Sequence, residues 1–206
     1  MPSALSRLVR RFRRGSAIVI VSGLPRSGTS MAMRMLEAGG VPLVIDGIRK
    51  ADGDNPNGYY ELEAVKSLDK GGPVDWLAES RGKAVKIVSH LVTWLPETFD
   101  YQVIFMERSL DEVMASQQKM LVNRDRVADA GDDARIRSGY ERHLEQTKRF
   151  LAGRACFSTL YLPYREVVEH PAAASRRIEA FLNRGLDVSA MAGVADRDLY
   201  RNRTGP

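Results

Sequence analysis

The residues 22–30, which read Ser-Gly-Leu-Pro-Arg-Ser-Gly-Thr-Ser, have the composition of a loop that binds an anion. Gly23 and Gly28 stand five positions apart, with an arginine and several hydroxyl-bearing residues around them. An apolar run at 17–21 precedes this stretch, and a helical pattern at 29–38 follows it. The order strand, glycine loop, helix directs backbone N–H groups and the positive end of a helix dipole at one negatively charged group. The sequence therefore predicts a phosphate-binding site, with a glycine turn that binds nothing as the alternative.

The loop lacks the lysine that nucleoside-triphosphate enzymes place after the second glycine of G-x-x-x-x-G-K-[ST]. That lysine reaches the β- and γ-phosphates, and the next hydroxyl holds Mg²⁺. Thr29 stands at the lysine position here, and Arg26 lies inside the loop instead. The loop thus argues against ordinary hydrolysis of ATP or GTP, and a P-loop nucleotide kinase or hydrolase is kept as an alternative.

Arg108 and Ser116 form a second candidate for binding an anion. Arg108 follows an apolar strand pattern at 102–106, and Ser116 lies about two helical turns further on. An arginine at the end of a strand can hold a phosphate with its planar fork, and a serine can add a hydroxyl. The alternative for Arg108 is an ion pair with Asp111 or Glu112, and the alternative for Ser116 is an ordinary serine of a helix surface.

The elements that must position these residues alternate along the chain. Strand patterns occur at 17–21, 41–45, 84–88, 102–106 and 156–162, and helical patterns at 29–38, from 61 to 68, 74–80, 110–121, 136–151 and 171–182. Such alternation predicts an α/β fold, a three-layer P-loop-like domain with a central parallel sheet flanked by helices. Ligands of these sheets bind at the carboxyl ends of the strands, so the loop, His90 and Arg108 are expected on one rim.

Three separated motifs resemble those of sulfotransferases that use 3′-phosphoadenosine 5′-phosphosulfate (PAPS). Residues 25–29 with Met31 resemble the loop P-[KR]-[ST]-G-T-x-[WML]. The span from Arg108 to Ser116 is similar to R-[ND]-P-x-D-x-x-x-S, although the acid stands one position earlier and Ser-Leu replaces the usual Asn-Pro. Residues 164–182 resemble the family segment Y-E-D-L … P … F-L. The resemblance covers roughly residues 17–184.

The resemblance implies that the chain takes PAPS as sulfuryl donor and transfers the sulfuryl group to a hydroxyl or amine. Arg26 matches the family's basic loop residue and would stabilise the leaving group, and no metal is implied. The residues that would bind the donor are Pro25, Arg26, Ser27, Gly28, Thr29, Ser30, Arg108 and Ser116.

His90 is the residue expected to act as the general base. Ser-His-Leu at 89–91, with Leu-Pro at 95–96, resembles the T-H-L…L-P of the cytosolic members. A structural hydrogen-bonding role for His90 is the alternative, in which case Glu61, Glu63 or Lys86 would be the base. His143 and His170 are interpreted as structural.

The acceptor, a small molecule or a glycan, is not encoded in a recognisable motif. The polar loop at 46–60 and the charged stretch at 123–133 are expected to shape its pocket. A protein that keeps the fold and binds a nucleotide without turnover is an alternative of a different class.

Composition fits one domain at 16–206 preceded by a basic amphipathic helix at 1–15. The single cysteine, Cys156, excludes an intramolecular disulfide and favours the cytoplasm. The net charge of +5 comes without the stacking aromatics of a nucleic-acid surface, so no nucleic acid is expected as partner. For residues 3–14, packing on the domain or a solvated face is the favoured interpretation, and weak contact with an anionic membrane surface or a targeting peptide are the alternatives.

Overall fold

The computed structural model of the protein describes residues 15–48, 58–122 and 133–195. All of the predicted N-terminal helix at 1–15 except Gly15, the centre of the loop at 46–60, and almost all of the stretch at 123–133 therefore lie outside the described residues.

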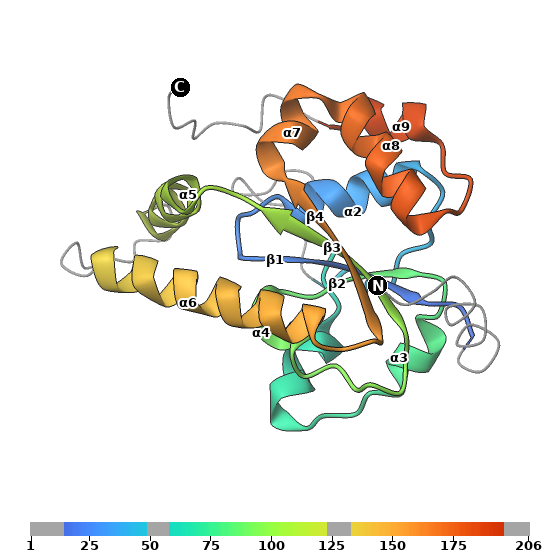
Figure 1. The fold of residues 1–206 in the computed structure, drawn as a ribbon, viewed down its shortest axis with the longest axis horizontal. Helices are drawn as coiled ribbons and strands as arrows, with labels where there is room; N and C mark the ends of the chain where they lie inside the picture. Colours follow the sequence, from blue (N-terminus) through green and yellow to red (C-terminus); the bar gives the residue numbers. More distant parts are fainter. Residues whose placement is uncertain (1–14, 49–57, 123–132, 196–206) are drawn as a thin grey trace.

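A parallel sheet forms the centre of the fold (Figure 1). Its strands are β1 (Ile18–Gly23), β2 (Ala84–Lys86), β3 (Tyr101–Glu107) and β4 (Phe157–Pro163), in the order β2-β1-β3-β4. Every residue of β1 is buried, as expected for the middle of a sheet that is covered on both sides. The register places Val21 of β1 beside Lys86 on one side and Ile104 on the other, so the carboxyl ends of these strands share one rim.

Helices pack on both faces of this sheet, which confirms the predicted three-layer α/β architecture (Figure 1). Successive β1 side chains point to opposite faces. Val19 and Val21 join the core beneath α2 (Thr29–Ala38), α7 (Tyr164–Glu169), α8 (Pro171–Leu182) and α9 (Val188–Gly193). Ile18 and Ile20 join the opposite core, with the 3₁₀ helix η1 (Glu63–Lys70), α3 (Trp76–Glu79), α4 (Ser89–Val92) and α6 (Asp133–Ala152). Among the described residues, one further helix, α5 (Leu110–Val122), follows the carboxyl end of β3.

The strand predicted at 41–45 is wrong, because the segment makes a single parallel bridge between Leu43 and Ala84. Pro42 has no N–H to donate to a ladder, although its carbonyl accepts a bond of 2.8 Å from the Ala84 amide. The chain then leaves the sheet at Asp46, whose amide donates to Glu61. The helix predicted from 61 to 68 is displaced and is a 3₁₀ helix, η1.

The C-terminal part holds a helix that hydrophobic periodicity did not reveal. Asp187 caps α9, because its side chain accepts a 2.8 Å hydrogen bond from the Ala190 amide. Met191 of α9 is fully buried against the core beneath α2. The sequence feature that indicates α9 is therefore its N-cap residue, Asp187, rather than a periodic row of apolar residues.

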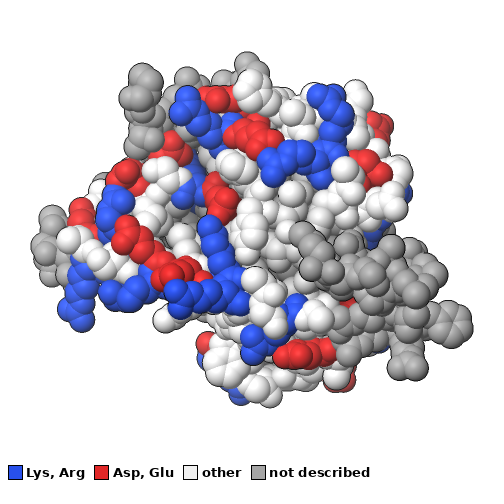
Figure 2. Space-filling model, viewed as in Figure 1, with Lys and Arg blue, Asp and Glu red and all other residues white. Residues whose placement is uncertain are grey.

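The exposed face of α6 carries charges of both signs, which alternate along the lower left of the molecule in Figure 2. Several of them are paired, as Arg149 is with Glu145 and Arg137 is with Asp111 of α5. Alternating, paired charges are typical of a solvated helix face. Among the described residues, no helix is long and apolar enough to cross a membrane.

Candidate anion-binding site

The predicted loop connects the end of β1 to the start of α2 and turns sharply at three positions. Gly23 and Gly28 have φ angles of 147° and 97°, and Arg26 has a φ of 70°, which is uncommon for a residue with a side chain. The Gly28 carbonyl accepts from the Ala32 amide at 3.1 Å and so starts the helix. The loop therefore sits at the N-terminus of α2, where backbone N–H groups and the helix dipole favour an anion.

Tyr164 and Met106 pack closely against the two glycines of this loop. A Cβ added to Gly28 would lie 2.7 Å from Cε2 of Tyr164, the first residue of α7, and one added to Gly23 would lie 2.6 Å from the Met106 carbonyl oxygen. Both distances are shorter than real Cβ contacts, so the two glycines are required by the approach of their neighbours. Tyr164 begins the motif at 164–182, but the sequence did not predict its contact with Gly28, because no pattern along the chain indicates which residue packs against the loop.

Arg108 lies beside the loop and is almost buried, with 7% of its side chain exposed. Its Nε donates to Oε2 of Glu112 at 2.9 Å, so the ion pair considered as the alternative is formed. Its Nη1 also donates to the Arg26 carbonyl at 3.0 Å, and its guanidinium lies 4.3 Å from the centroid of the Tyr164 ring. Arg108 thus supports the loop as well as pairing with the acid.

Ser116 completes a cluster of three predicted residues. Its Oγ accepts a 3.0 Å hydrogen bond from Nε of Arg26, across 90 positions of sequence. Arg26, Arg108 and Ser116 therefore meet at one rim of the sheet, as the rule for parallel sheets predicts. Two guanidinium groups, one paired with Glu112, stand at the N-terminus of α2, which makes this rim electropositive.

Ser27 carries an unsatisfied polar atom inside the loop. Ser27 as a whole is 1% exposed, and its Oγ has no hydrogen-bond partner in the part of the chain that the structure describes. Buried hydroxyls are normally hydrogen-bonded, so the Ser27 hydroxyl lacks a partner that the described residues do not supply. Of the other predicted loop residues, Thr29 is buried and Pro25 is exposed.

Lys86 joins the loop to the segment at residues 58–63, which we call the tyrosine segment. It ends β2, its side chain is 7% exposed, and its Nζ contacts the Tyr59 carbonyl, Ser30 Oγ at 3.5 Å and Glu61 Oε1 at 3.5 Å. The sequence named Lys86 only as a fallback base. The pairing of β2 with β1 is what brings it to the loop.

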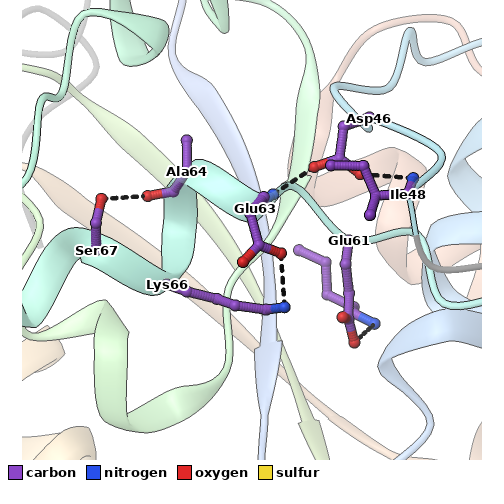
Figure 3. A network of polar contacts seen from close by, with 8 residues as sticks. Asp46, Ile48, Glu61, Glu63, Ala64, Lys66 and Ser67 are labelled. Atoms are coloured by element: carbon purple, nitrogen blue, oxygen red, sulfur yellow. Dashed lines mark hydrogen bonds and ion pairs between the residues drawn. The ribbon is translucent and has the colours of Figure 1, made fainter.

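Asp46 makes hydrogen bonds to both sides of the polar loop at 46–60, whose last residues belong to the tyrosine segment (Figure 3). Its carboxylate accepts hydrogen bonds from the amides of Ile48 and Glu63, and these two bonds hold the pKa of Asp46 below its ordinary value. Figure 3 also shows Glu63 paired with Lys66 and Glu61 turned toward a neighbouring amino group, that of Lys86. The tyrosine segment is thus held in place from several sides.

His90 lies on α4 with an exposed side chain and stands near His143 of α6. His143 Nε2 shares a 2.8 Å hydrogen bond with Oγ of the buried Ser89. Burial, and then the charge of His90, lowers the pKa of His143 below its ordinary value. Within the described residues, no hydrogen bond or ion pair connects the His90 side chain to the loop, and His170 lies at the junction of α7 and α8.

The described residues contain no group of three His, Cys, Asp or Glu side chains that could hold a metal ion. The donors gathered on the rim are instead guanidinium groups, hydroxyls and backbone amides. This donor set is suited to phosphate or sulfate oxygens.

Solved sulfotransferase structures share this fold. Sulfotransferase STF9 from Mycobacterium avium matches with a TM-score of 0.55 at 14% identity, over 92% of this chain and 69% of its own. STF1 from Mycobacterium tuberculosis H37Rv matches with a TM-score of 0.55 at 19% identity, over 91% of this chain and 72% of its own. Retinol dehydratase, solved in complex with androsterone and the inactive cofactor PAP, has a TM-score of 0.47 at 16% identity and is matched over 86% of this chain and 62% of its own.

No protein-family model matches the chain, and no curated protein does. The identities to the solved structures are low, so the shared property is the architecture. The chain has the sulfotransferase fold, and the resemblance drawn from its motifs is confirmed at the level of the fold.

Proposed function

We propose that the protein is a sulfotransferase that moves a sulfuryl group from PAPS to a hydroxyl or amine. The observation that carries this proposal is the contact of Arg26 with Ser116 and Arg108 at a glycine loop without the lysine of ATP-hydrolysing enzymes. PAPS has two anionic ends, a 5′-phosphosulfate and a 3′-phosphate. A rim that joins two anion-binding motifs fits such a nucleotide better than a single triphosphate.

The residues present fit the donor, because the loop offers an orphaned Ser27 hydroxyl at the helix N-terminus. The loop amides with Ser27, Thr29 and Ser30 would hold the 5′ end, and Arg108 with Ser116 the 3′ end. PAPS supplies the sulfuryl group when bound. Arg26 would stabilise the charge that develops on the leaving oxygen, since such transfers rest on positioning and charge stabilisation. Glu112 holds the Arg108 guanidinium in place.

Binding of 3′-phosphoadenosine 5′-phosphate (PAP) tests the donor class directly. At about 100 times its dissociation constant, PAP should stabilise the fold by about 2.7 kcal/mol, or roughly 5 to 10 °C for a chain of this size. ATP with Mg²⁺ is the matched comparison, and we expect it to give a smaller shift in melting temperature.

A shift with ATP alone would favour the kinase or hydrolase alternative, and no shift with PAP contradicts the proposal. A shift with PAP but no transfer of label from PAPS, across a broad screen of hydroxyl and amine acceptors, would identify the non-catalytic nucleotide-binding alternative.

We assign the role of general base to His90, and the chain supplies a matched control in His143. His90→Gln is expected to lower the turnover number about 100-fold, the lower range for a positioned base, and to leave the affinity for PAP unchanged. His143→Gln should retain turnover within about threefold, because Ser89 already holds its Nε2. Steady-state kinetics with labelled PAPS and calorimetry with PAP separate the two effects. A larger loss of turnover in His143→Gln than in His90→Gln would assign the role of general base to His143 instead.

The acceptor is proposed to be a small molecule or a glycan. One domain at 16–206, with residues 1–15 as a basic helix, is the organisation that composition favours. The cytoplasm remains the proposed compartment, because the single cysteine is buried and unpaired.

A further inference from the structure

Arg34 is a partly buried cation that the proposed donor site does not use. It lies on α2 one turn after Ser30, and its Nη1 atom is buried without a hydrogen-bond partner among the described residues. A buried guanidinium nitrogen that lacks an acceptor is costly, and arginines are normally buried only when paired. The described residues supply no such acceptor, which leaves Arg34 able to take one from a ligand.

The tyrosine segment runs along the face of α2 that carries Arg34. Ser30 Oγ contacts the Tyr59 carbonyl at 3.5 Å, and the Tyr60 hydroxyl donates to Oε2 of Glu37 at 3.2 Å. Ser30, Arg34 and Glu37 follow one another at spacings of four and three, so they share one face of the helix. Arg34 therefore lies between the two points at which the segment touches α2.

The groups that act on the pKa of Tyr60 agree with this arrangement. Burial and the neighbouring Glu37 carboxylate raise the pKa of Tyr60, and the charge of Arg34 opposes that rise. Arg34 is thus close enough to act on the hydroxyl of Tyr60 through its charge.

The backbone of the tyrosine segment is held in a strained shape opposite Arg34. Tyr60 has a φ of 52°, in the left-handed region that residues with a side chain rarely adopt. The Glu63 amide donates to Asp46 (Figure 3), and Lys86 contacts the Tyr59 carbonyl, so the segment is kept in place from two sides. Strain that the surroundings hold in place is common where a protein preorganises a binding surface.

Two described carboxylates that contact α2 or the tyrosine segment are engaged with other groups. Glu37 accepts from Tyr60, and Glu61 lies 3.5 Å from Lys86. Neither makes a described ion pair with Arg34, so the guanidinium keeps its charge for a ligand.

We propose that Arg34 binds an anionic group of the acceptor, most simply a carboxylate, and so selects acceptors that carry a negative charge beside the reacting hydroxyl or amine. This inference rests on the proposed function. One helical turn, about 5.4 Å, separates Arg34 from Ser30 of the loop, which is close to the length of one aromatic ring. A planar guanidinium suits a carboxylate because the two can form parallel hydrogen bonds.

Benzoate and benzyl alcohol test the proposal, because they share a ring and differ in charge. With PAP saturating the loop, calorimetry should show benzoate binding at least about tenfold more tightly than benzyl alcohol. Arg34→Gln should remove that preference, and Arg34→Lys should retain part of it. Arg34→Met, which keeps the apolar stem, replaces the glutamine variant if the latter fails to fold. Arg149→Gln, on the exposed face of α6, is the control and should change nothing.

Several outcomes would overturn the inference. Benzoate that fails to bind the wild-type protein at millimolar concentration contradicts it, as does a preference that survives in Arg34→Gln. A loss of PAP affinity in Arg34→Gln would place the residue in the donor site instead. If the wild-type protein does not bind PAP, the proposed donor is wrong, and titration of the free protein with benzoate still decides whether Arg34 is an anion site.

Discussion

Replacement of Arg26 by alanine is expected to lower the turnover number for sulfuryl transfer about 100- to 1,000-fold, the usual cost of removing one preorganised donor at a developing charge. Arg26 is the one basic residue of the loop at 22–30. Ser116 fixes its Nε at 3.0 Å, and Arg108 fixes its carbonyl at 3.0 Å. The guanidinium is therefore oriented before any ligand arrives, and steady-state kinetics with labelled PAPS would measure its loss.

Three variants separate orientation, charge and binding at this position. Ser116→Ala keeps the charge but removes the bond to Nε, so we expect a smaller loss of turnover, about tenfold. Arg26→Lys should also lose less than alanine because it keeps a cation. Arg108→Ala should act mainly by raising the dissociation constant of PAP, which calorimetry measures. Turnover of Arg26→Ala within threefold of wild type would assign charge stabilisation elsewhere, with Lys86 as the nearest described cation at Ser30.

The rim itself was predictable because its loop, strand and helix each leave a local pattern in the sequence. The glycine loop, the strand before Arg108 and the helix carrying Ser116 each have a pattern in the sequence. The parallel-sheet rule then places them at one edge. The contact between Arg26 and Ser116 was not predictable, because it joins side chains 90 positions apart and depends on how α5 leaves the sheet.

Other parts of the site depend on tertiary packing that leaves no local signal. Tyr164 appears in a motif, yet only the fold shows that its ring supports Gly28 and Arg108. His143 looks like an ordinary polar-face residue until α4 brings Ser89 and His90 to it. The strand predicted at 41–45 was wrong for a local reason that the sequence did contain, since Pro42 cannot donate to a ladder.

The second large effect is expected on stability, where Gly28→Ala should lower the free energy of unfolding by about 3 to 4 kcal/mol. The φ of Gly28 is 97°, so an alanine there is strained whatever space it has. Its Cβ would also enter the Tyr164 ring, 2.7 Å from Cε2. Tyr164 is 4% exposed and its ring lies against the Arg108 guanidinium, so the ring has little freedom to withdraw. Urea unfolding with an unchanged m-value would measure the loss.

Gly40→Ala separates the backbone strain from the clash. Gly40 has a nearly equal φ of 92° but no atom within 4 Å of an added Cβ, so we expect a loss of about 1 to 2 kcal/mol. The difference between the two variants is then the cost of pushing Tyr164 away from the loop. In a Tyr164→Ala background that difference should largely disappear, because the ring that meets the new Cβ is gone. Equal losses at Gly28 and Gly40 would show that the loop does not depend on Tyr164 for its shape, and the support for the anion site would have to come from Arg108 and Ser116 alone.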